Sequence, residues 1–332
     1  MKLQIVDKVN KKDWESLINQ FNGNLYHSIE WANIQMTKNR IPQYFKYMEQ
    51  NECIGIALGF ISKSKFPLSL LSKSLSFDTT PCVLNDDPIL LYEMVREIRD
   101  FSKKTKYISL YLDSYDSRNS LDNLEELGFN LIHRIEFVID LTKTEEELWN
   151  NMESNFRKKI RKGIKNNIII EENGTINGLK QLVSLMDQSL ARHGVYHFSE
   201  EKIVNIKKLI DFRLAKLFTA KYNGDIVSVI LVTLYNKKGY YMYGGNSDMG
   251  LKCEASRFLI WHTILDIKRM GFTSYTIGGV PKESEYEGSP QHGLYMFKKE
   301  FGGEKRYCYS GAIENLNKTR NNVVNIIRSF KG

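Results

Sequence analysis

The spacing of apolar and polar residues predicts a series of α and β elements in the first half of the chain. Apolar residues at every third or fourth position indicate helices, and strict alternation indicates strands. The expected elements are helices near 14–21 and 28–38, a hairpin over 44–62, an extended segment at 74–84, a helix near 87–103 and a strand from 107. A short helix that ends at Leu127 and a strand over 131–141 are expected to follow.

The second half repeats this series. Helices are expected near 178–191 and 200–211, a hairpin with an Asn-Gly turn over 216–236, a strand at 239–245, a helix near 254–270 and a strand at 273–279. Equivalent turns and strands are offset by about 170 residues, which indicates an internal duplication. We expect two α/β domains with mixed sheets, at 1–143 and 168–332, joined by a basic helix at 144–167.

The joining helix has two contrasting faces. Thr144 and the three glutamates after it form a capping-box start. A helical projection predicts an apolar stripe of Met152, Phe156, Ile160 and Ile164. The opposite arc carries Arg157, Lys158, Arg161, Lys162 and Lys165. Such a run of cations is either a solvated face or a surface for RNA or another anion.

Composition and charge narrow the class of protein. The chain has 332 residues, of which 42% are hydrophobic, and a net charge of +8, which favours anionic partners. It has no apolar run of membrane-spanning length and no signal peptide, so a cytoplasmic location is expected. Its four cysteines are scattered without metal-ligand or disulfide spacing, so no metal and no cofactor are expected.

The segment GLYMFKKEFGGEKRYCYSG, residues 293–311, places two lysines among aromatic residues and ends them with Gly-Gly. One interpretation is structural, with Leu294, Phe297 and Phe301 as the apolar face of a helical turn. The other is chemical, because a lysine held by aromatic neighbours can bind phosphate or stabilise an oxyanion. Adjacent residues point in different directions, so only one lysine of the pair is expected to reach such a site.

The order helix, helix, hairpin, strand, helix, strand is that of the GNAT acyltransferase fold, here in tandem. The chain resembles the FemABX aminoacyltransferases and the related BioF2-like acetyltransferase domain proteins. The likeness lies in these segments, which span nearly the whole chain: YHSIEWANI, LEELGFNLIHRIEFVIDL, LWNNMESNFRKKIRKGIK, ARHGVY, YYMYGGNS and GLYMFKKEFGGEKRYCYSG.

The resemblance implies roles for individual residues. Arg192 and Tyr196 would face the diphosphate of the acceptor, and Tyr243 would contact the substrate. Phe297 and Lys298 would be the catalytic Phe-Lys pair, with the lysine near the tetrahedral oxyanion.

One position departs from the family pattern. The phosphate-binding lysine that often follows the first-unit tryptophan is replaced by Gln35, and Lys38 lies nearly one turn further on.

Neither a general base nor a coenzyme A loop is evident. Asp78, Glu283, Glu285 and Glu287 are better explained as surface acids, and isolated histidines are usually structural. The segment before the helix at 254–270 lacks the Arg/Gln-x-x-Gly-x-Gly/Ala pattern that holds a pyrophosphate. A proton relay through substrate or water and an aminoacyl-tRNA donor are therefore favoured.

Three functions remain open. The favoured one is aminoacyl transfer from aminoacyl-tRNA to an amine of lipid II or of a UDP-linked muropeptide, with peripheral association at the inner membrane face as an option. The second is BioF2-like N-acylation of an amino sugar with an acyl-CoA or carrier-bound donor. The third is binding of anions or RNA without catalysis.

Overall fold

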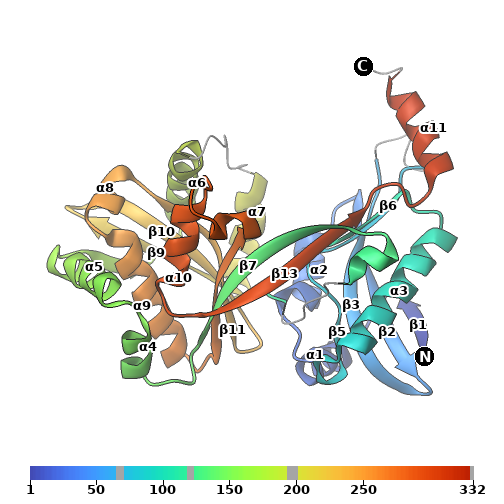
Figure 1. Cartoon of the computed structure of the whole chain (residues 1–332), viewed down its shortest axis with the longest axis horizontal. Helices are drawn as coiled ribbons and strands as arrows, with labels where there is room; N and C mark the ends of the chain where they lie inside the picture. Colours follow the sequence, from blue (N-terminus) through green and yellow to red (C-terminus); the bar gives the residue numbers. More distant parts are fainter. Residues whose placement is uncertain (65–70, 118–122, 193–200, 330–332) are drawn as a thin grey trace. The chain divides into compact units, whose positions relative to one another are not determined.

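The chain forms two compact units. The computed structural model describes residues 1–64, 71–117, 123–192 and 201–329. The first unit contains Met1–Arg134 and Tyr307–Gly332, and the second contains Ile135–Arg306. The chain leaves the first unit within β7 (Asn130–Asp140) and returns to it within β13 (Glu304–Ile313) (Figure 1).

The first unit is built on strands in the order β1-β2-β3-β4-β6. Neighbouring strands are antiparallel except for β4 and β6, which are parallel. Its elements are β1 (Lys2–Val6), α1 (Lys11–Gln20), η1 (Leu25–His27), α2 (Ile29–Gln35), β2 (Arg40–Glu49), β3 (Glu52–Ser62), β4 (Ser74–Phe77), β5 (Cys82–Val83), η3 (Leu84–Asp86), α3 (Pro88–Lys104), β6 (Ser109–Leu112), η4 (Leu124–Leu127) and α11 (Lys318–Ser329).

The second unit has the strand order β7-β12-β11-β10-β9-β8. Here β11 and β12 are the parallel pair. Its elements are α4 (Glu145–Asn151), α5 (Ser154–Lys165), β8 (Ile169–Glu172), α6 (Ile176–Ala191), α7 (Glu201–Asp211), β9 (Ala215–Tyr222), β10 (Asp225–Tyr235), β11 (Lys238–Asn246), α8 (Asp248–Lys252), α9 (Ala255–Arg269), β12 (Ser274–Pro281), η5 (Lys282–Glu285) and α10 (His292–Lys299).

The two units repeat one pattern of pairing. In each, a first strand pairs with a hairpin, a third strand continues the antiparallel sheet, and a long helix leads to a strand parallel to the third. The long helices are α3 and α9, and both begin after the third strand and end before its parallel partner. The mixed α/β fold and the repeated element order predicted from the sequence are confirmed.

The basic helix is interrupted. The predicted capping box is present, because the Thr144 side chain accepts from the backbone N–H of Glu147 and Glu147 accepts from that of Thr144. The backbone of Met152 is extended, however, so α4 ends before this residue and a separate helix, α5, begins at Ser154. The guanidinium of Arg157 donates to three carbonyls around the end of α4, those of Trp149, Asn150 and Met152. A continuous helix was therefore a wrong expectation, since these carbonyls are satisfied by a side chain.

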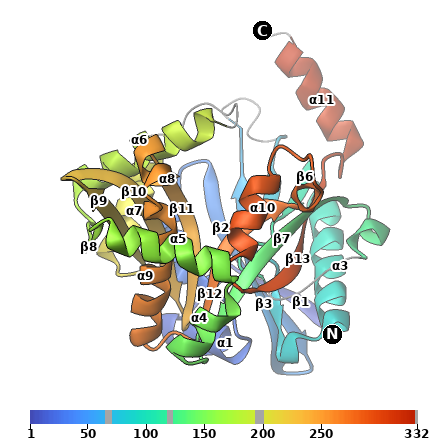
Figure 2. The same ribbon diagram turned by 60° about the vertical axis from the view of Figure 1, so that its left-hand side comes forward.

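The restart also moves the apolar face of α5. Phe156 and Ile160 are fully buried as predicted, but Ile164 is 50% exposed and Gly163 takes its place in the interface. A Cβ at Gly163 would lie 2.8 Å from the Cβ of Phe258 and 3.2 Å from the carbonyl oxygen of Glu254. Thus α5 and α9 pack almost backbone to backbone, and Figure 2 shows α5 crossing α9.

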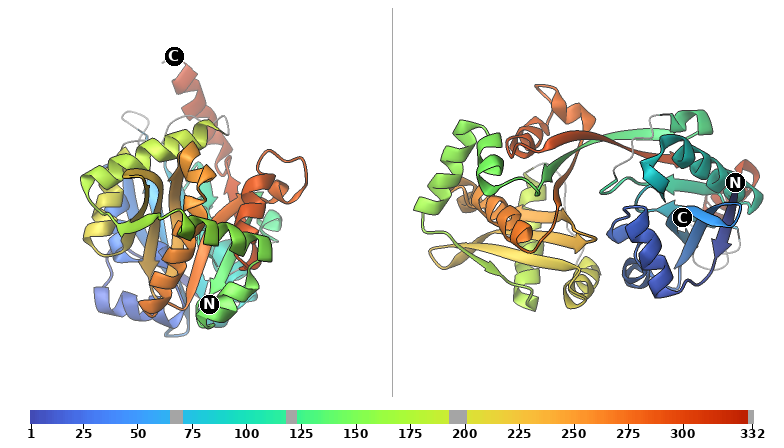
Figure 3. Two further views of the ribbon diagram at one scale, coloured as in Figure 1. Left: turned by 90° about the vertical axis from the view of Figure 1, so that its left-hand side faces the viewer. Right: turned by 90° about the horizontal axis from the view of Figure 1, so that it is seen from below.

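The sheet of the second unit is covered on both faces. The face that bears Ile230 and Val232 packs in one core cluster with residues of α5 and α9. On the other face, a Cβ at Gly245 would lie 2.4 Å from the backbone of Leu185 in α6. We call these the α9 face and the α6 face; Figure 3 shows the helices on the two sides of the strands.

Gly163→Ala should loosen the contact between α5 and α9. The added methyl group has no room, and overpacking of this kind costs about 1–3 kcal/mol, partly offset by about 1 kcal/mol of helix propensity. Urea unfolding should show a lower midpoint. Ile164→Ala is the control, since an exposed side chain should change stability by only about 0.5 kcal/mol. Equal midpoints for the two variants would contradict the close packing.

Candidate acyl-transfer site

The candidate site begins where the parallel strands β11 and β12 stop pairing. Their pairing runs from Lys238 with Ser274 to Tyr240 with Thr276, and in the described chain the two strands then continue without further pairs between them, while β11 stays paired with β10. Two local features accompany this separation. β11 has a bulge at Met242, and β12 passes through Gly278 with a positive φ of 63°.

Lys298 of α10 lies at this point. The side chain is only 6% exposed, and its Nζ donates to the carbonyl oxygen of Gly279 at 3.0 Å. Nζ also lies 5.7 Å from the ring centroid of Tyr241. A Cβ at Gly278 would be 3.4 Å from this nitrogen, so the glycine leaves space for the ammonium group. A buried cation fixed by a backbone carbonyl is suited to stabilise negative charge on an acyl oxygen.

The two neighbouring lysines separate as predicted, although the helix packs differently. Lys299 is exposed, with its Nζ 6.0 Å from the ring centroid of Tyr295. Leu294, expected in the apolar face, is 36% exposed, and Tyr295 is buried in its place at 5%. Because Tyr295 and Lys298 are three residues apart, they share one face of the helix.

The other two expected aromatic contacts are present. Phe301 is 3% exposed, and its ring packs edge-on against Phe297 at 5.6 Å. The Gly-Gly sequence serves the chain's own packing. Gly302 has a φ of 74°, and a Cβ there would lie 2.6 Å from the carbonyl oxygen of Asn151. A glycine is therefore needed at this position for the end of α10 to pack against the end of α4.

Tyr241 and Tyr243 lie on opposite faces of the sheet. Residues two apart in a strand normally share a face, but the bulge pairs Tyr241 with Val232 and Tyr243 with Leu231. Tyr241 packs with the core of the α9 face. Lys202 of α7 lies over the ring of Tyr243 at 5.6 Å. Burial raises the pKa of both phenols.

Arg192 is held at the C-terminal end of β11. Its guanidinium donates to the carbonyl oxygen of Asn246 at 2.8 Å, to Ser189 at 3.0 Å and to Asp248 at 3.2 Å. It follows α6 and is thus on the side of Tyr243. Tyr196 lies outside the described residues.

Gln35 and Lys38 belong to the first unit. Gln35 ends α2 and accepts from Arg40 at 2.6 Å, while Lys38 is exposed in the turn before β2. Arg40 is the cation beside Gln35, but both oxygens of Asp78 accept from it, at 2.8 and 2.9 Å. Trp31 also donates to Asp78. This acid therefore has structural partners.

The cations of α5 are of two kinds. Arg157 is half-buried against the end of α4. Lys159 is also half-buried, with its Nζ 3.9 Å from a carboxylate oxygen of Glu300. The remaining four are exposed: Lys158, Arg161, Lys162 and Lys165. The guanidinium of Arg161 lies 5.1 Å from the ring of Trp149, and Lys162 donates to the carbonyl oxygen of Lys252 at 3.3 Å.

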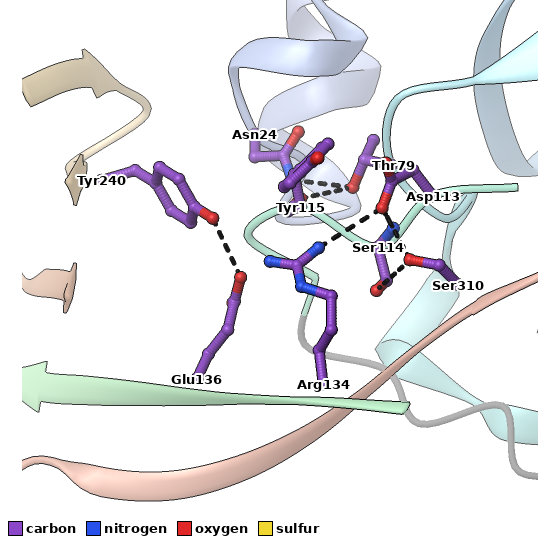
Figure 4. A network of polar contacts seen from close by, with 9 residues as sticks. All are labelled: Asn24, Thr79, Asp113, Ser114, Tyr115, Arg134, Glu136, Tyr240 and Ser310. Carbon is purple, nitrogen blue, oxygen red and sulfur yellow. Dashed lines mark hydrogen bonds and ion pairs between the residues drawn. The ribbon is translucent and has the colours of Figure 1, made fainter. Parts of the chain in front are cut away.

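Two polar clusters escaped the sequence analysis (Figure 4). In the second unit, Glu136 is 1% exposed and accepts from the hydroxyl of Tyr240 at 3.0 Å. In the first unit, Asp113 accepts from Ser310 at 2.6 Å and from Arg134 at 3.4 Å. The only signal for Glu136 was an acid inside an apolar strand, which usually indicates a solvent-facing position.

The start of α9 is covered by the chain itself. Its N-cap, Glu254, has a φ of 62° and makes no capping bond with its side chain. The close contact at Gly163 places α5 over this point, and Asn166 donates to the carbonyl oxygen of Cys253 at 3.0 Å. Diphosphates bind helix starts through free N–H groups and the positive dipole end. Here α5 packs over the helix start, and the carboxylate of Glu254 at this point accepts from Arg257 at 2.7 Å, so the start of α9 is not open to a diphosphate.

The sequence analysis also considered metal sites, membrane-spanning segments, reactive cysteines and histidines, and the described residues bear on each. Within them, no three His, Cys, Asp or Glu side chains gather as metal ligands, and no helix is long and apolar enough to cross a membrane. Cys82, Cys253 and Cys308 are buried thiols, and Cys53 is a half-buried thiol. His292 has a structural contact with the carbonyl oxygen of Ser284.

Comparisons with known proteins show which proteins this chain is similar to. A protein family described as "Acetyltransferase (GNAT) domain" matches residues 150–289. The UDP-N-acetylmuramoylpentapeptide-lysine N(6)-alanyltransferase of Weissella viridescens is 24% identical over 215 residues, covering 61% of this chain and 59% of that enzyme. The lipid II:glycine glycyltransferase of Staphylococcus saprophyticus is 20% identical over 360 residues, covering 84% of this chain and 85% of that enzyme. The chain therefore carries a GNAT acetyltransferase domain and is similar to FemABX-type aminoacyltransferases.

A solved structure supports the same assignment at the level of the fold. The crystal structure of FemX matches with a TM-score of 0.75 at 16% identity and covers 98% of this chain and 100% of that one. A tandem GNAT protein from the clavulanic acid biosynthesis pathway also matches, with a TM-score of 0.55 at 8% identity, so the tandem GNAT fold is shared. The aligned stretch spans less than two thirds of the Weissella enzyme, at 59% of its length.

Lys298→Met should slow acyl transfer while Lys299→Met leaves it nearly unchanged. Loss of one oxyanion donor typically lowers kcat by about 10²–10³-fold, and KM should change little if the charge develops only in the transition state. Steady-state kinetics of both variants provide the measurement. Equal, small effects would return Lys298 to a purely structural role. Circular dichroism of both variants controls for folding.

Proposed function

We propose that this protein transfers an aminoacyl group from aminoacyl-tRNA to an amine of a peptidoglycan precursor. The acceptor would be lipid II or a UDP-linked muropeptide. The names of two relatives support this class of acceptor, since one is an alanyltransferase acting on a UDP-linked pentapeptide and the other a glycyltransferase acting on lipid II.

The observation that carries the choice of donor is the packing of α5 over the start of α9. Coenzyme A would need the helix start that Glu254 and Gly163 occupy. In its place, α5 offers an exposed row of cations, and phosphate neutralisation by Lys and Arg supplies most of the non-specific affinity for RNA. Both features favour a polyanionic donor without a pyrophosphate at α9.

In the proposed reaction, the nitrogen of the acceptor attacks the carbonyl carbon of the aminoacyl ester. The bond from that carbon to the ribose oxygen breaks, the ammonium formed loses a proton, and the ribose oxygen gains one. Lys298 would hold the carbonyl oxygen while it carries negative charge. Among the candidate acids, Asp78 is held by Arg40 and Trp31, and Glu285 by Lys305 and Tyr295. Glu283 and Glu287 are exposed to solvent. The proton would therefore leave through substrate or water.

A donor and acceptor matrix tests the proposal. Radiolabelled aminoacyl-tRNA and acetyl-CoA would each be incubated with lipid II, its UDP-linked precursor and amino sugars. Label from tRNA in a muropeptide product supports the proposal. Thiol release from acetyl-CoA on an amino sugar would favour the BioF2-like alternative, and RNA binding without product would favour the binding protein.

The exposed cations of α5 should determine the salt dependence of tRNA binding. Replacing Lys158, Arg161 and Lys165 by Gln should flatten the slope of log Kd against log salt by about 0.7–0.9 per lost phosphate contact. Filter binding at several salt concentrations measures this slope. Folding should be nearly unchanged, because these side chains are exposed.

Arg157→Gln is the contrasting variant. Arg157 caps the end of α4 through three carbonyls, so its loss should lower the unfolding free energy by about 1–2 kcal/mol while the salt slope stays close to that of the wild type. A triple variant with the wild-type slope would show that α5 is a solvated face.

A further inference from the structure

The bulge in β11 gives the site two chemically distinct sides. The α9 face carries Lys298 and Tyr241, and the α6 face carries Tyr243 with Lys202 of α7 over its ring. The two tyrosines are two residues apart and lie where β11 and β12 stop pairing. An acyl group held between these strands would therefore meet one phenol on each side.

The cationic residues of the second unit are also divided between the α9 face and the α6 face. The helix α5, whose outer surface is cationic, packs in one cluster with Tyr241 and α9. Arg192 follows α6 and belongs to the side of Tyr243. If a polyanionic donor uses the cations of α5, its acyl end would reach the separated strands from the side of α9, and the acceptor would then lie on the side of α6.

Tyr241 is placed by its neighbours. Its hydroxyl extends over Gly244, where a Cβ would lie 1.8 Å from that oxygen. The ring of Tyr275 fills the space beside Gly239, two residues before Tyr241, at 3.0 Å from the position of a Cβ. Tyr275 is fully buried and, within the described chain, its hydroxyl has no hydrogen-bond partner. The absence of side chains at Gly239 and Gly244 thus leaves room for two phenols on the α9 face.

We propose that Tyr241 contacts the donor, with its hydroxyl donating a hydrogen bond to the ribose oxygen of the aminoacyl ester. This inference rests on the proposed function and adds a residue to it. As the carbon–oxygen bond breaks, negative charge grows on that oxygen, and a neutral donor beside it stabilises the leaving group. The amine loses one proton and the ribose oxygen gains one through water, so the step balances without a change in Tyr241.

The state of the phenol suits this role. Burial raises the pKa of Tyr241, so the hydroxyl stays protonated throughout the neutral range and acts as a donor. Tyr243 offers the same chemistry on the other face, where the acceptor lies. The pair is therefore an internal control, since Tyr→Phe removes the same atom at two sites separated by one residue.

The test compares Tyr241→Phe with Tyr243→Phe in the full-length protein. One readout is single-turnover transfer from aminoacyl-tRNA at saturating acceptor. The other is calorimetric binding of 3′-O-(2-aminopropyl)adenosine, a stable ether analogue of the tRNA terminus that keeps the ribose oxygen. Tyr241→Phe should slow transfer about tenfold or more and weaken binding of the analogue about 2–10-fold. Tyr243→Phe should leave binding of the analogue unchanged and alter the KM for the acceptor.

A second variant displaces the Tyr241 hydroxyl without changing Tyr241 itself. Gly244→Ala introduces a methyl group where the Tyr241 hydroxyl lies, so it should reproduce the loss seen with Tyr241→Phe. Gly293→Ala is its control, because a Cβ there has no heavy atom within 4 Å. Unfolding curves of all four variants report whether a loss comes from folding.

The outcomes separate this inference from the proposed function. Two outcomes would overturn the role of Tyr241 and leave the proposed function standing. In the first, Tyr241→Phe transfers the aminoacyl group as fast as the wild type. In the second, Tyr241→Phe and Tyr243→Phe change the binding of the analogue equally. A wild-type protein that neither binds the analogue nor uses aminoacyl-tRNA would overturn both.

Discussion

The candidate site depends on the point at which β11 and β12 stop pairing. Parallel strands with regular geometry would continue their hydrogen bonds to the end. Here an unpaired residue in β11, Met242, and a left-handed glycine in β12, Gly278, accompany the loss of pairing. The freed strand ends provide backbone groups, and one of them, the carbonyl of Gly279, fixes the ammonium of Lys298. The bulge also places Tyr241 and Tyr243 on different faces. The end of this strand pairing thus provides a position for the Lys298 ammonium, and the bulge beside it separates the two sides of the site.

The sequence predicted what depends on local periodicity. Helix and strand types, the duplication and the separation of Lys298 from Lys299 all follow from which residues recur at 2 or 3.6 positions. The interruption at Met152 was not predicted, because it depends on a side-chain-to-backbone contact, in which the guanidinium of Arg157 satisfies the end of α4, and periodicity does not show such a contact. Once the helix restarts, the stripe shifts, and Gly163 replaces Ile164 in the core.

The site itself was only partly predictable. Lys298 was found through family resemblance and a plausible helical face, whereas the bulge that separates Tyr241 from Tyr243 leaves no mark in the pattern YYMYGG. Buried acids are harder still. Glu136 alternates with apolar residues as a solvent-facing strand residue would, and only the covering of both sheet faces makes it buried. Burial on the second face of a strand is a property of the tertiary fold, which single-strand periodicity does not encode.

The same packing connects stability with donor choice. A Cβ at Gly163 would meet Phe258, so α5 can approach α9 closely only because a glycine lies at the crossing. That approach buries the start of α9, where an acyl-CoA pyrophosphate would need exposed N–H groups. It also fixes the orientation of α5 so that its apolar residues face the core and its lysines face solvent. A helix that covers the start of α9 and presents cations to solvent supports the proposed nucleic acid donor on physical grounds.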